Sequence, residues 1–252
     1  MTRRQVLNIT TTKKHDVMRF SNIPAGGSSS TPGAWVTSSD RHSIWCATGR
    51  YQEVGNVEFA RQRTSIYARG LREVIRFQIS DGTEWCWRRV VFSYKGPIYG
   101  QEEVGLGPDS ATVDRDTDDG VVYYRQFNEP TGSPLESFYD LIFKGEQGID
   151  WQGTYDAKLD RTRVTVLSDV RRSLKSGNSS AHEHTFKLWY PFNKTIVYDD
   201  DEIGSSKGSS AFSVQSKAGM GDVYVYDLFR KIGGGGSAMA IGGNSTFYWH
   251  ER

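Results

Sequence analysis

The chain has 252 residues, with 31 lysines and arginines against 30 aspartates and glutamates, so its formal net charge is +1. A nearly neutral chain does not bind polyanions as a whole, and any contact with nucleic acid has to come from local basic clusters. Aromatic residues make up 13% of the chain, which favours a sizeable core because each buries a large area. We expect a single all-β domain over residues 1–252, since β-sandwiches of roughly 200–250 residues are ordinary single domains.

The cysteines and the apolar runs exclude several classes of protein. Cys46 and Cys86 do not make a disulfide framework, and no pair of Cys-x-x-Cys motifs indicates a zinc site. The first residues lack the apolar core of a signal peptide, and no apolar run reaches the length of a membrane span. We expect a soluble protein that is not conventionally secreted, with no membrane partner and no cofactor.

Strand patterns begin close to the N-terminus. The first predicted strand runs from Arg3 to Thr12 and is followed by the polar cluster Lys13–Asp16. A loop without an apolar face is expected from about Asn22 to Pro32, and another strand around Ser43 to Ala47.

The most strongly patterned segment is Leu71–Lys95, which predicts a β-hairpin. Apolar and polar residues alternate with the period of a half-buried strand: Leu71, Ile75, Phe77 and Ile79 on one parity, Arg72, Arg76, Gln78 and Ser80 on the other. Asp81-Gly82 favours a tight turn with positive φ. On the return strand, one face carries Cys86, Val90, Phe92 and Tyr94, and the other carries Trp85, Trp87, Arg89 and Val91. Neither face is polar enough to be fully exposed to water, so we expect the second face to meet another subunit or a polyanion.

One helix is predicted. Ser133 fits an N-cap, Pro134 the first helical position and Glu136 a capping box, while Gly145 can close the C-terminus. Four apolar residues between them have helical spacing, namely Leu135, Phe138, Tyr139 and Ile142.

Strands return after the helix. They are expected within Arg163–Val170, His182–Phe192, Val223–Phe229 and Phe247–Trp249, after a shorter run at Val121–Phe127 and a loop at Gly100–Gly120. About eight strands with long loops and one short helix predict an eight-stranded jelly-roll β-sandwich.

Three motifs that resemble catalytic or metal sites are better explained as loops or structural residues. Gly204–Gly208 matches Gly-x-Ser-x-Gly but lacks the flanking strand and helix, which favours a solvated loop. Asp114, Asp116 and Asp118 resemble the start of a calcium loop but lack its glycine and its final glutamate. His182 and His184 share a strand face, and no further metal ligands of a cupin follow, so we interpret them as structural or pH-sensitive. We therefore expect no catalytic and no metal residues, and a protein that is not an enzyme.

Basic residues next to aromatic ones are the more informative pattern. Arg88-Arg89 lies beside Trp85 and Trp87, and further cations gather at Arg3, Arg4, Lys13 and Lys14 and again at Arg161, Arg163, Arg171, Arg172 and Lys175. Basic side chains that neutralise phosphates, combined with aromatic rings that stack on bases, bind single strands without reading their sequence. Each doublet alone more often forms a solvated or salt-bridged surface.

The same residues carry a family resemblance. Val6–Asp16, Arg69–Glu73, Trp85–Gly96 and the late run Val223–Phe229 resemble the capsid proteins of genomoviruses, which are small circular single-stranded DNA viruses distantly similar to geminiviruses. The resemblance extends through most of the chain.

The resemblance implies a jelly-roll subunit that assembles with its own copies into a T=1 icosahedral shell around circular single-stranded DNA. It also implies a virion protein that enters the host nucleus for assembly and meets a host receptor of unknown identity. The DNA-binding residues expected on this basis are Arg3, Arg4, Lys13, Lys14, Arg88, Arg89, Trp85 and Trp87. The two tryptophans are expected to stack on bases or to lie at a subunit interface, and packing in the core is the alternative. Such proteins begin with an arginine-rich arm, of which Arg3-Arg4 would be the remnant, and we expect that an arm was removed or left out.

A carbohydrate-binding or carbohydrate-cleaving jelly roll is the alternative. Exposed Trp and Tyr would stack on sugars, and a pair of carboxylates would cleave them.

Overall fold

Eight strands of six or more residues frame the protein. The computed structural model describes residues 10–23, 31–53, 59–95, 98, 114–116, 120–233 and 237–252. The eight strands are β1 (Thr12–Ile23), β4 (Arg41–Cys46), β5 (Ser65–Ile79), β6 (Glu84–Tyr94), β10 (Thr165–Leu174), β11 (His182–Val197), β14 (Asp222–Ile232) and β15 (Met239–Glu251).

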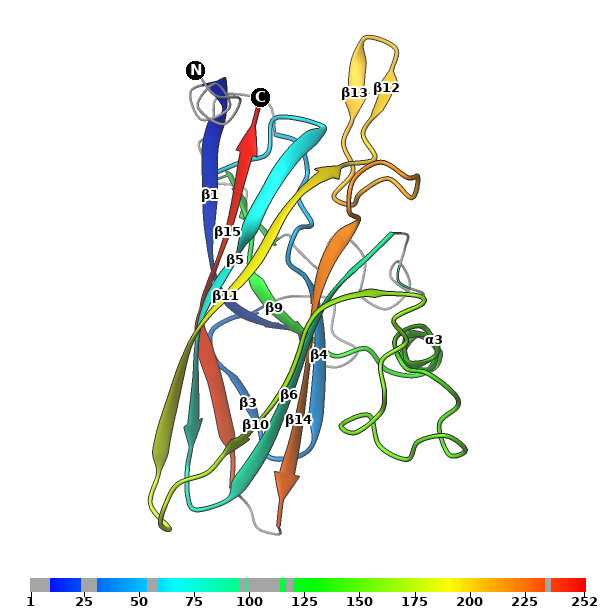
Figure 1. The fold of residues 1–252 in the computed structure, drawn as a ribbon. Helices are drawn as coiled ribbons and strands as arrows, with labels where there is room; N and C mark the ends of the chain where they lie inside the picture. Colours follow the sequence, from blue (N-terminus) through cyan, green and yellow to red (C-terminus); the bar gives the residue numbers. More distant parts are fainter. Residues whose placement is uncertain are drawn as a thin grey trace, which may run out of the picture.

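The strands form two facing layers (Figure 1). One, here called sheet I, has the order β10-β6-β14-β4, and the other, sheet II, has the order β1-β15-β5-β11. The short strand β9 (Arg125–Asn128) joins them by pairing with β4 and with β1, while β2 (Thr31–Pro32) and β3 (Trp35–Thr37) extend β1 and β15. Each layer combines strands from distant parts of the chain, so the predicted eight-stranded jelly-roll sandwich is confirmed.

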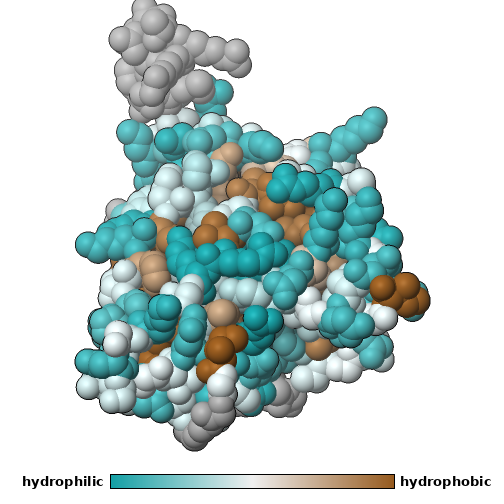
Figure 2. All heavy atoms as spheres, turned by 60° about the horizontal axis from the view of Figure 1, so that its bottom comes forward, coloured by the Kyte–Doolittle hydropathy of each residue, from teal (hydrophilic) through white to brown (hydrophobic). Residues whose placement is uncertain are grey.

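The start of β11 and the start of β15 lie at the same end of sheet II. His182 and Met239 both pair with Ile79, the last residue of β5. Figure 2 brings this end of the molecule forward, and brown apolar residues reach the surface there between teal hydrophilic ones. This end is called the lower end below.

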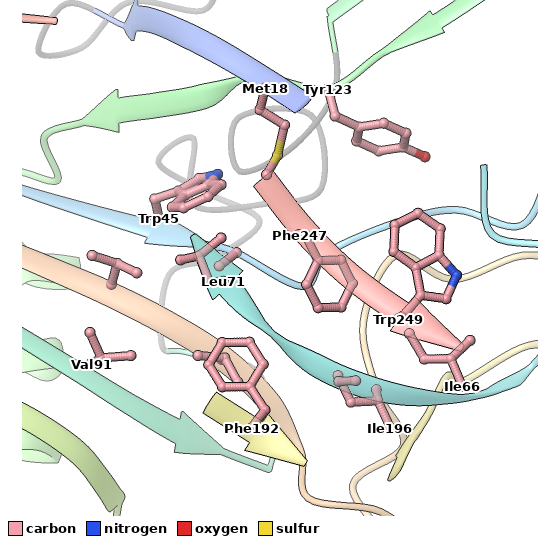
Figure 3. Packing of buried hydrophobic residues seen from close by; sticks show 14 of the residues in the cluster. Met18, Trp45, Ile66, Leu71, Val91, Tyr123, Phe192, Ile196, Phe247 and Trp249 are labelled. Carbon is pink, nitrogen blue, oxygen red and sulfur yellow. The ribbon is translucent and has the colours of Figure 1, made fainter. Parts of the chain in front are cut away.

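The main core lies between the two sheets (Figure 3). Trp45 and Val91 of sheet I pack in one cluster with Leu71, Phe247 and Trp249 of sheet II, and each is at most 1% exposed. Every one of these residues alternates with a neighbour that faces away, which is why the period-2 pattern predicted the strands well.

The predicted hairpin at Leu71–Lys95 is wrong in its pairing. The chain does reverse near Asp81-Gly82, where the Thr83 amide donates to the Asp81 carboxylate at 2.8 Å. However, β5 pairs with β15 and β11, whereas β6 pairs with β10 and β14. The segment therefore crosses from sheet II to sheet I, and among the described residues neither Asp81 nor Gly82 has positive φ.

The second face of β6 is covered by the chain itself. Helix α3 (Ser133–Ile142) packs Phe138 and Ile142 against Val90 and Phe92 on the outer face of sheet I. This corrects the expectation that another subunit or a polyanion meets that face. A sequence pattern shows that a face is apolar, but it does not show what covers that face.

The ends of two elements also differ from prediction. The N-cap of α3 is Gly132 with φ 67° and no side-chain cap, because Ser133 lies one residue inside the helix, and the C-cap is Phe143 rather than Gly145. Most of the predicted strand Arg3–Thr12 lies outside the described residues, and the polar cluster Lys13–Asp16, which was expected to follow a strand, lies within β1. Among the described residues no helix is long and apolar enough to cross a membrane.

Asp222 is a buried carboxylate whose ionisation opposes folding. It is 1% exposed and accepts hydrogen bonds from the Ser213 amide at 2.9 Å and hydroxyl at 2.8 Å. Burial outweighs these bonds and raises its pKa to about 6. The pKa of Asp222 is higher in the folded protein than in the unfolded chain, where it is about 4. The free energy of unfolding therefore rises as the pH falls from above 6 to about 4.

We therefore expect Asp222→Asn to stabilise the protein at pH 8 and to have little effect near pH 4.5. A shift of about two pKa units corresponds to at most about 3 kcal/mol. Urea unfolding at pH 8, 6 and 4.5 measures the difference between the two proteins. An equal difference at all three pH values would show that the carboxylate does not titrate as described.

Candidate nucleic-acid interface

Most of the basic and aromatic residues expected to bind DNA lie in the interior. Trp85, Trp87, Arg88 and Arg89 are each 0% exposed. They therefore pack in the core, which is the alternative given above for the two tryptophans, and in this structure they are not placed to contact a polymer outside the folded subunit.

Arg89 belongs to a buried group of four charges between the two sheets. Its guanidinium bonds both Asp227 oxygens, at 2.7 and 2.8 Å, and also pairs with Glu73. Arg125 bridges the same two carboxylates, at 2.5 Å to Asp227 and 3.3 Å to Glu73. The Trp87 indole donates to Asp227 at 2.7 Å. The group contains two positive and two negative charges, so no charge is left unpaired in the interior, where an unpaired charge would be strongly destabilising.

Arg88 points to the other side of sheet I. It bonds both oxygens of Asp169, at 2.9 and 3.0 Å, and donates to the carbonyls of Thr154 and Tyr155 at 2.7 and 3.0 Å. All its described partners belong to the subunit, so this arginine holds the segment after α3 onto β10.

The four N-terminal cations divide differently. Arg3 and Arg4 lie outside the described residues. Lys13 is exposed on β1, but Lys14 is only 5% exposed, and its ammonium contacts the Ala60 carbonyl at 2.8 Å, Gln62 at 2.9 Å and Glu251 at 3.4 Å. Because adjacent residues of a strand face opposite ways, one lysine is at the surface and its neighbour in the core.

The outer face of sheet II carries a group of surface cations. Strand register brings together five side chains on this face: Lys13, Arg19, Arg72, Arg76 and Lys187. Arg69, at the irregularity of β5, adds a sixth, because it bonds Asn193 and its charge acts on His250. None of the six forms an ion pair with a carboxylate among the described residues. The acidic residues of these four strands face inward, apart from Glu183 at the lower end. The result is a basic strip on a protein of nearly neutral net charge.

Aromatic rings lie within this strip. Trp189 is 49% exposed and sits 5.9 Å from Tyr248, which in turn stacks on His15 at 5.8 Å. Tyr67 is 38% exposed and lies 6.1 Å from His250. A surface that binds a single-stranded polynucleotide needs cations that neutralise the phosphates and exposed aromatic rings that stack on the bases. Here the strip with its rings is called the sheet II platform.

His250 of the platform responds to the charges around it. Burial, and the nearby charges of Arg69 and Lys13, lower the pKa of His250. It is therefore neutral at pH 7, and a bound polyanion would favour its protonated form.

Part of the platform was readable from the sequence. Arg72 and Arg76 stand on the polar parity of the predicted strand, opposite Leu71 and Ile75. What links them to Lys187 and Trp189 is the register Val74↔Lys187 and Arg72↔Trp189, and no sequence signal sets a pairing between segments more than a hundred residues apart.

The other motifs do not add to this site. His184 stacks on Phe186 at 6.3 Å and its ring nitrogen lies 3.1 Å from the Lys175 carbonyl. Gly204–Gly208 forms the turn and second strand of an exposed hairpin, and the side chains of Asp114, Asp116 and Asp118 lie outside the described residues. Within the described ranges, no group of three or more His, Cys, Asp or Glu side chains is arranged to hold a metal ion.

Lys13 and Lys14 give a direct test of the platform. Lys13→Ala is expected to weaken binding of an oligothymidylate and to lower the magnitude of the salt slope by about 0.7, while thermal stability stays unchanged. Lys14→Ala is expected to lower stability by roughly 1–3 kcal/mol, because it leaves the buried Glu251 carboxylate short of a partner, with the salt slope unchanged. Fluorescence anisotropy over a salt series and thermal unfolding measure the two effects. A reversed pattern would place Lys14 at the surface and remove Lys13 from the interface.

Comparison with known proteins finds little similarity. No family model matches the chain, and no curated protein matches it. Among solved structures, the crystal structure of the T13 infectious bursal disease virus particle aligns with 96% of this chain and 73% of its own at 9% identity and a TM-score of 0.12. The structure of the Gx strain of the same virus aligns with 96% and 77% at 10% identity and a TM-score of 0.13. Similarity at this level does not define a family.

Proposed function

We propose that the chain is the capsid protein of a small circular single-stranded DNA virus of the genomovirus kind. Its copies form a T=1 icosahedral shell, and the sheet II platform holds the enclosed DNA through nonspecific contacts to the backbone. The observation that carries the proposal is the platform itself, where the described residues place six cations without an ion pair, one carboxylate and exposed rings on one face of a jelly roll.

The chemistry of the platform suits a genome of any sequence. Lysine and arginine contacts to phosphate do not depend on the base, and a ring stacks on any of the four bases. Six phosphate contacts on a single strand predict a salt slope of about −4. The remaining parts of the proposal, namely assembly in the host nucleus and a host receptor, rest on the family resemblance.

Particle size of the purified chain tests the function. Light scattering and negative-stain microscopy over a range of salt and pH are expected to show uniform closed particles. The ratio of absorbance at 260 and 280 nm then tells whether they contain nucleic acid. A monomer under every condition that also lacks affinity for oligothymidylate would overturn the proposal.

Exposed Trp189 and Tyr67 also suit a carbohydrate, which is the second candidate function. A neutral glycan releases no counterions, so its affinity would be nearly independent of salt, whereas DNA binding falls steeply as salt rises. Binding of a neutral glycan array by Trp189 at high salt, without affinity for DNA, would favour this second function.

A further inference from the structure

A row of three rings crosses the outer face of sheet II. His15 of β1 pairs with Tyr248 of β15, and Tyr248 pairs in turn with Gly70 of β5. The His15 and Tyr248 rings stack at 5.8 Å, and Trp189 of β11 meets Tyr248 edge to face at 5.9 Å and 64°. The row therefore reaches from the first strand of the sheet to the last, and it passes over the glycine.

Gly70 leaves the space in which the Trp189 ring lies. A Cβ atom at this position would be 2.7 and 2.8 Å from Cζ2 and Cη2 of the indole, and 2.5 Å from the Tyr190 carbonyl oxygen. Non-bonded carbon atoms pack at about 3.5–4.0 Å, so no side chain fits there. The six-membered ring of the indole therefore lies against the backbone of β5, with Tyr248 packed beside it. These two contacts hold the ring in place.

Trp189 is the most exposed of the seven tryptophans. It is 49% exposed although part of its ring rests on β5. The Trp151 indole is less exposed and donates to the Gly145 carbonyl at 3.3 Å. The other five are at most 6% exposed, namely Trp35, Trp45, Trp85, Trp87 and Trp249. One large ring is therefore held open to solvent on a rigid support.

Cations lie beside this ring on the same face of the sheet. Arg72 pairs directly with Trp189, and Lys187 lies two residues before it on β11. Both cations are exposed, and neither forms an ion pair within the described part of the chain. A base stacked on Trp189 therefore brings its own phosphates next to positive charges.

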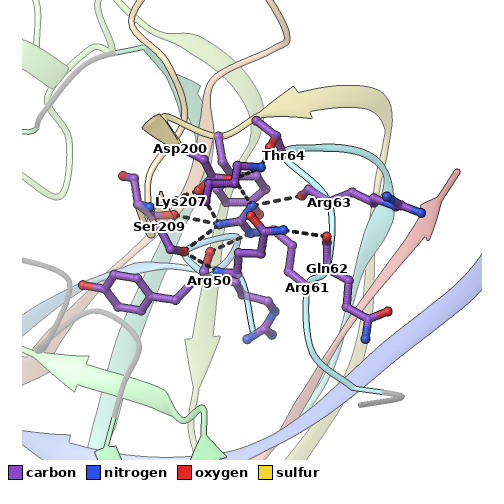
Figure 4. Close-up of polar contacts among 12 residues, drawn as sticks. Arg50, Arg61, Gln62, Arg63, Thr64, Asp200, Lys207 and Ser209 are labelled. Carbon is purple, nitrogen blue, oxygen red and sulfur yellow. Dashed lines mark hydrogen bonds and ion pairs between the residues drawn. The ribbon is translucent and has the colours of Figure 1, made fainter. Parts of the chain in front are cut away.

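A cation beside a ring is not by itself a binding surface. Arg61 lies 3.9 Å from the centre of the Tyr198 ring, but its guanidinium bonds both oxygens of Asp200, at 2.6 and 2.9 Å. The side chains of Arg61 and Asp200 are 0% exposed, and Figure 4 shows them enclosed by polar contacts of the same subunit. The group at Trp189 differs because its ring and its cations are exposed.

We propose that Trp189 is the base-stacking residue of the sheet II platform and makes the platform selective for unpaired bases. A base of a single strand is free to stack on the indole, whereas the bases of a duplex are enclosed in the helix and leave only phosphates to contact. Gly70 is a positioning residue that acts through the indole. The inference rests on the proposed function in that the polyanion on the platform is DNA.

Three DNA ligands of equal length separate stacking from charge: an oligothymidylate, a single strand of abasic sites, and a duplex. The first two carry the same phosphates and differ only in their bases. Stacking on Trp189 is expected to make the oligothymidylate bind roughly tenfold more tightly than the abasic strand. Fluorescence anisotropy with labelled ligands measures all three affinities. Equal affinity for the two single strands would overturn the role of Trp189.

Two variants assign the difference to the indole. Trp189→Ala is expected to lower oligothymidylate affinity roughly tenfold, to about that of the abasic strand. Its affinities for the abasic strand and the duplex are expected to stay unchanged. Trp189→Phe keeps an aromatic face and is expected to retain most of the oligothymidylate affinity. An equal loss for all three ligands in Trp189→Ala would show that the tryptophan supports the fold of the platform and does not stack on bases.

Tryptophan fluorescence gives an independent signature. Because Trp189 is the most exposed tryptophan, a stacked thymine is expected to quench the emission of the unmodified protein, and the abasic strand is expected to leave it unchanged. Trp189→Phe is expected to bind the oligothymidylate without quenching. Quenching that persists in this variant would come from another tryptophan and would count against the assignment.

Gly70→Ala tests the position of the ring. The added methyl group displaces the indole from β5, so oligothymidylate affinity and quenching are both expected to fall, while affinity for the abasic strand stays. Gly242→Ala is the matched control on the same face, because a Cβ atom there meets only Ala34, at 3.7 Å. Unchanged quenching in a folded Gly70→Ala variant would overturn the positioning role. The Trp189 variants decide the stacking role even if Gly70→Ala does not fold.

The outcomes separate this role from the proposed function. If both single strands bind equally, each with a steep salt slope, the stacking role fails and the capsid proposal stands on charge alone. If none of the three ligands binds, the platform itself is overturned together with the inference.

Discussion

Replacing Asp227 with alanine is expected to destabilise the subunit by about 3–5 kcal/mol. The change leaves Arg89 and Arg125 in the interior with one carboxylate, Glu73, between them, and it removes the acceptor of the Trp87 indole. Unpaired charge in a water-free site costs far more than a lost surface pair. Urea unfolding followed by tryptophan fluorescence measures the change.

Asp156→Ala is the matched control for this variant. Its carboxylate is 74% exposed and lies 3.7 Å from Arg230, so its loss is expected to change stability by less than about 1 kcal/mol. Comparable unfolding midpoints for the two variants would mean that water reaches the four charges.

Acid should weaken the same group of charges. Burial pushes the pKa of Asp227 upward, but the guanidinium groups of Arg89 and Arg125 bring it below its ordinary value. Because the pKa of Asp227 is lower in the folded protein than in the unfolded chain, its ionised form stabilises the fold. This stabilisation is complete above the unfolded-state pKa of about 4, and it is lost as the pH falls through the folded-state pKa. Asp222, with its raised pKa, acts in the opposite sense between about pH 6 and 4. Acid unfolding below pH 4 therefore reports on Asp227 and not on Asp222.

Replacing Arg69, Arg72 and Arg76 together with alanine is expected to lower the affinity for an oligothymidylate by roughly 100-fold at 0.1 M salt. The magnitude of the salt slope should fall by about 2, because three phosphate contacts at about 0.7 each are removed. None of the three arginines pairs with a carboxylate among the described residues, so the folded subunit loses little stability. Fluorescence anisotropy from 50 to 400 mM salt gives both quantities.

The matched control removes three exposed cations elsewhere, with Lys158, Arg161 and Lys217 changed to alanine. Both triple variants have the same net charge. If they bind equally, the overall field of the protein holds the DNA and the sheet II platform is not the interface.

The four buried charges also explain how the sandwich is held in register. Glu73 comes from β5 in sheet II, Asp227 and Arg89 from β14 and β6 in sheet I, and Arg125 from β9 between them. Their hydrogen bonds need defined geometry, whereas apolar contacts between sheets tolerate sliding. A fold with this group displaced by one residue would bury charges without partners.

Much of the architecture follows from local pattern. Alternation in Leu71–Ile79 predicted a strand because a strand turns every second side chain to the same face. The valines and aromatic residues of Val223–Phe229 predicted another strand, and the helical spacing of Phe138 and Ile142 predicted α3. The number of strands and the turn-rich loops between them then favoured the jelly roll. These features depend on neighbours along the chain.

The location of each charged residue was decided by tertiary structure. Arg72 and Arg89 both stand in predicted strands beside apolar residues, yet Arg72 is exposed and Arg89 is completely buried. The difference arises because Asp227 and Glu73, far away in sequence, supply carboxylates to Arg89, while the outer face of sheet II is left open. The sequence alone determined that the chain forms strands and that these strands contain many basic and aromatic residues. Only the pairing of distant strands decided which cations neutralise carboxylates in the core and which stay exposed on the outer face of sheet II, because that pairing sets the partners and the water around each charge.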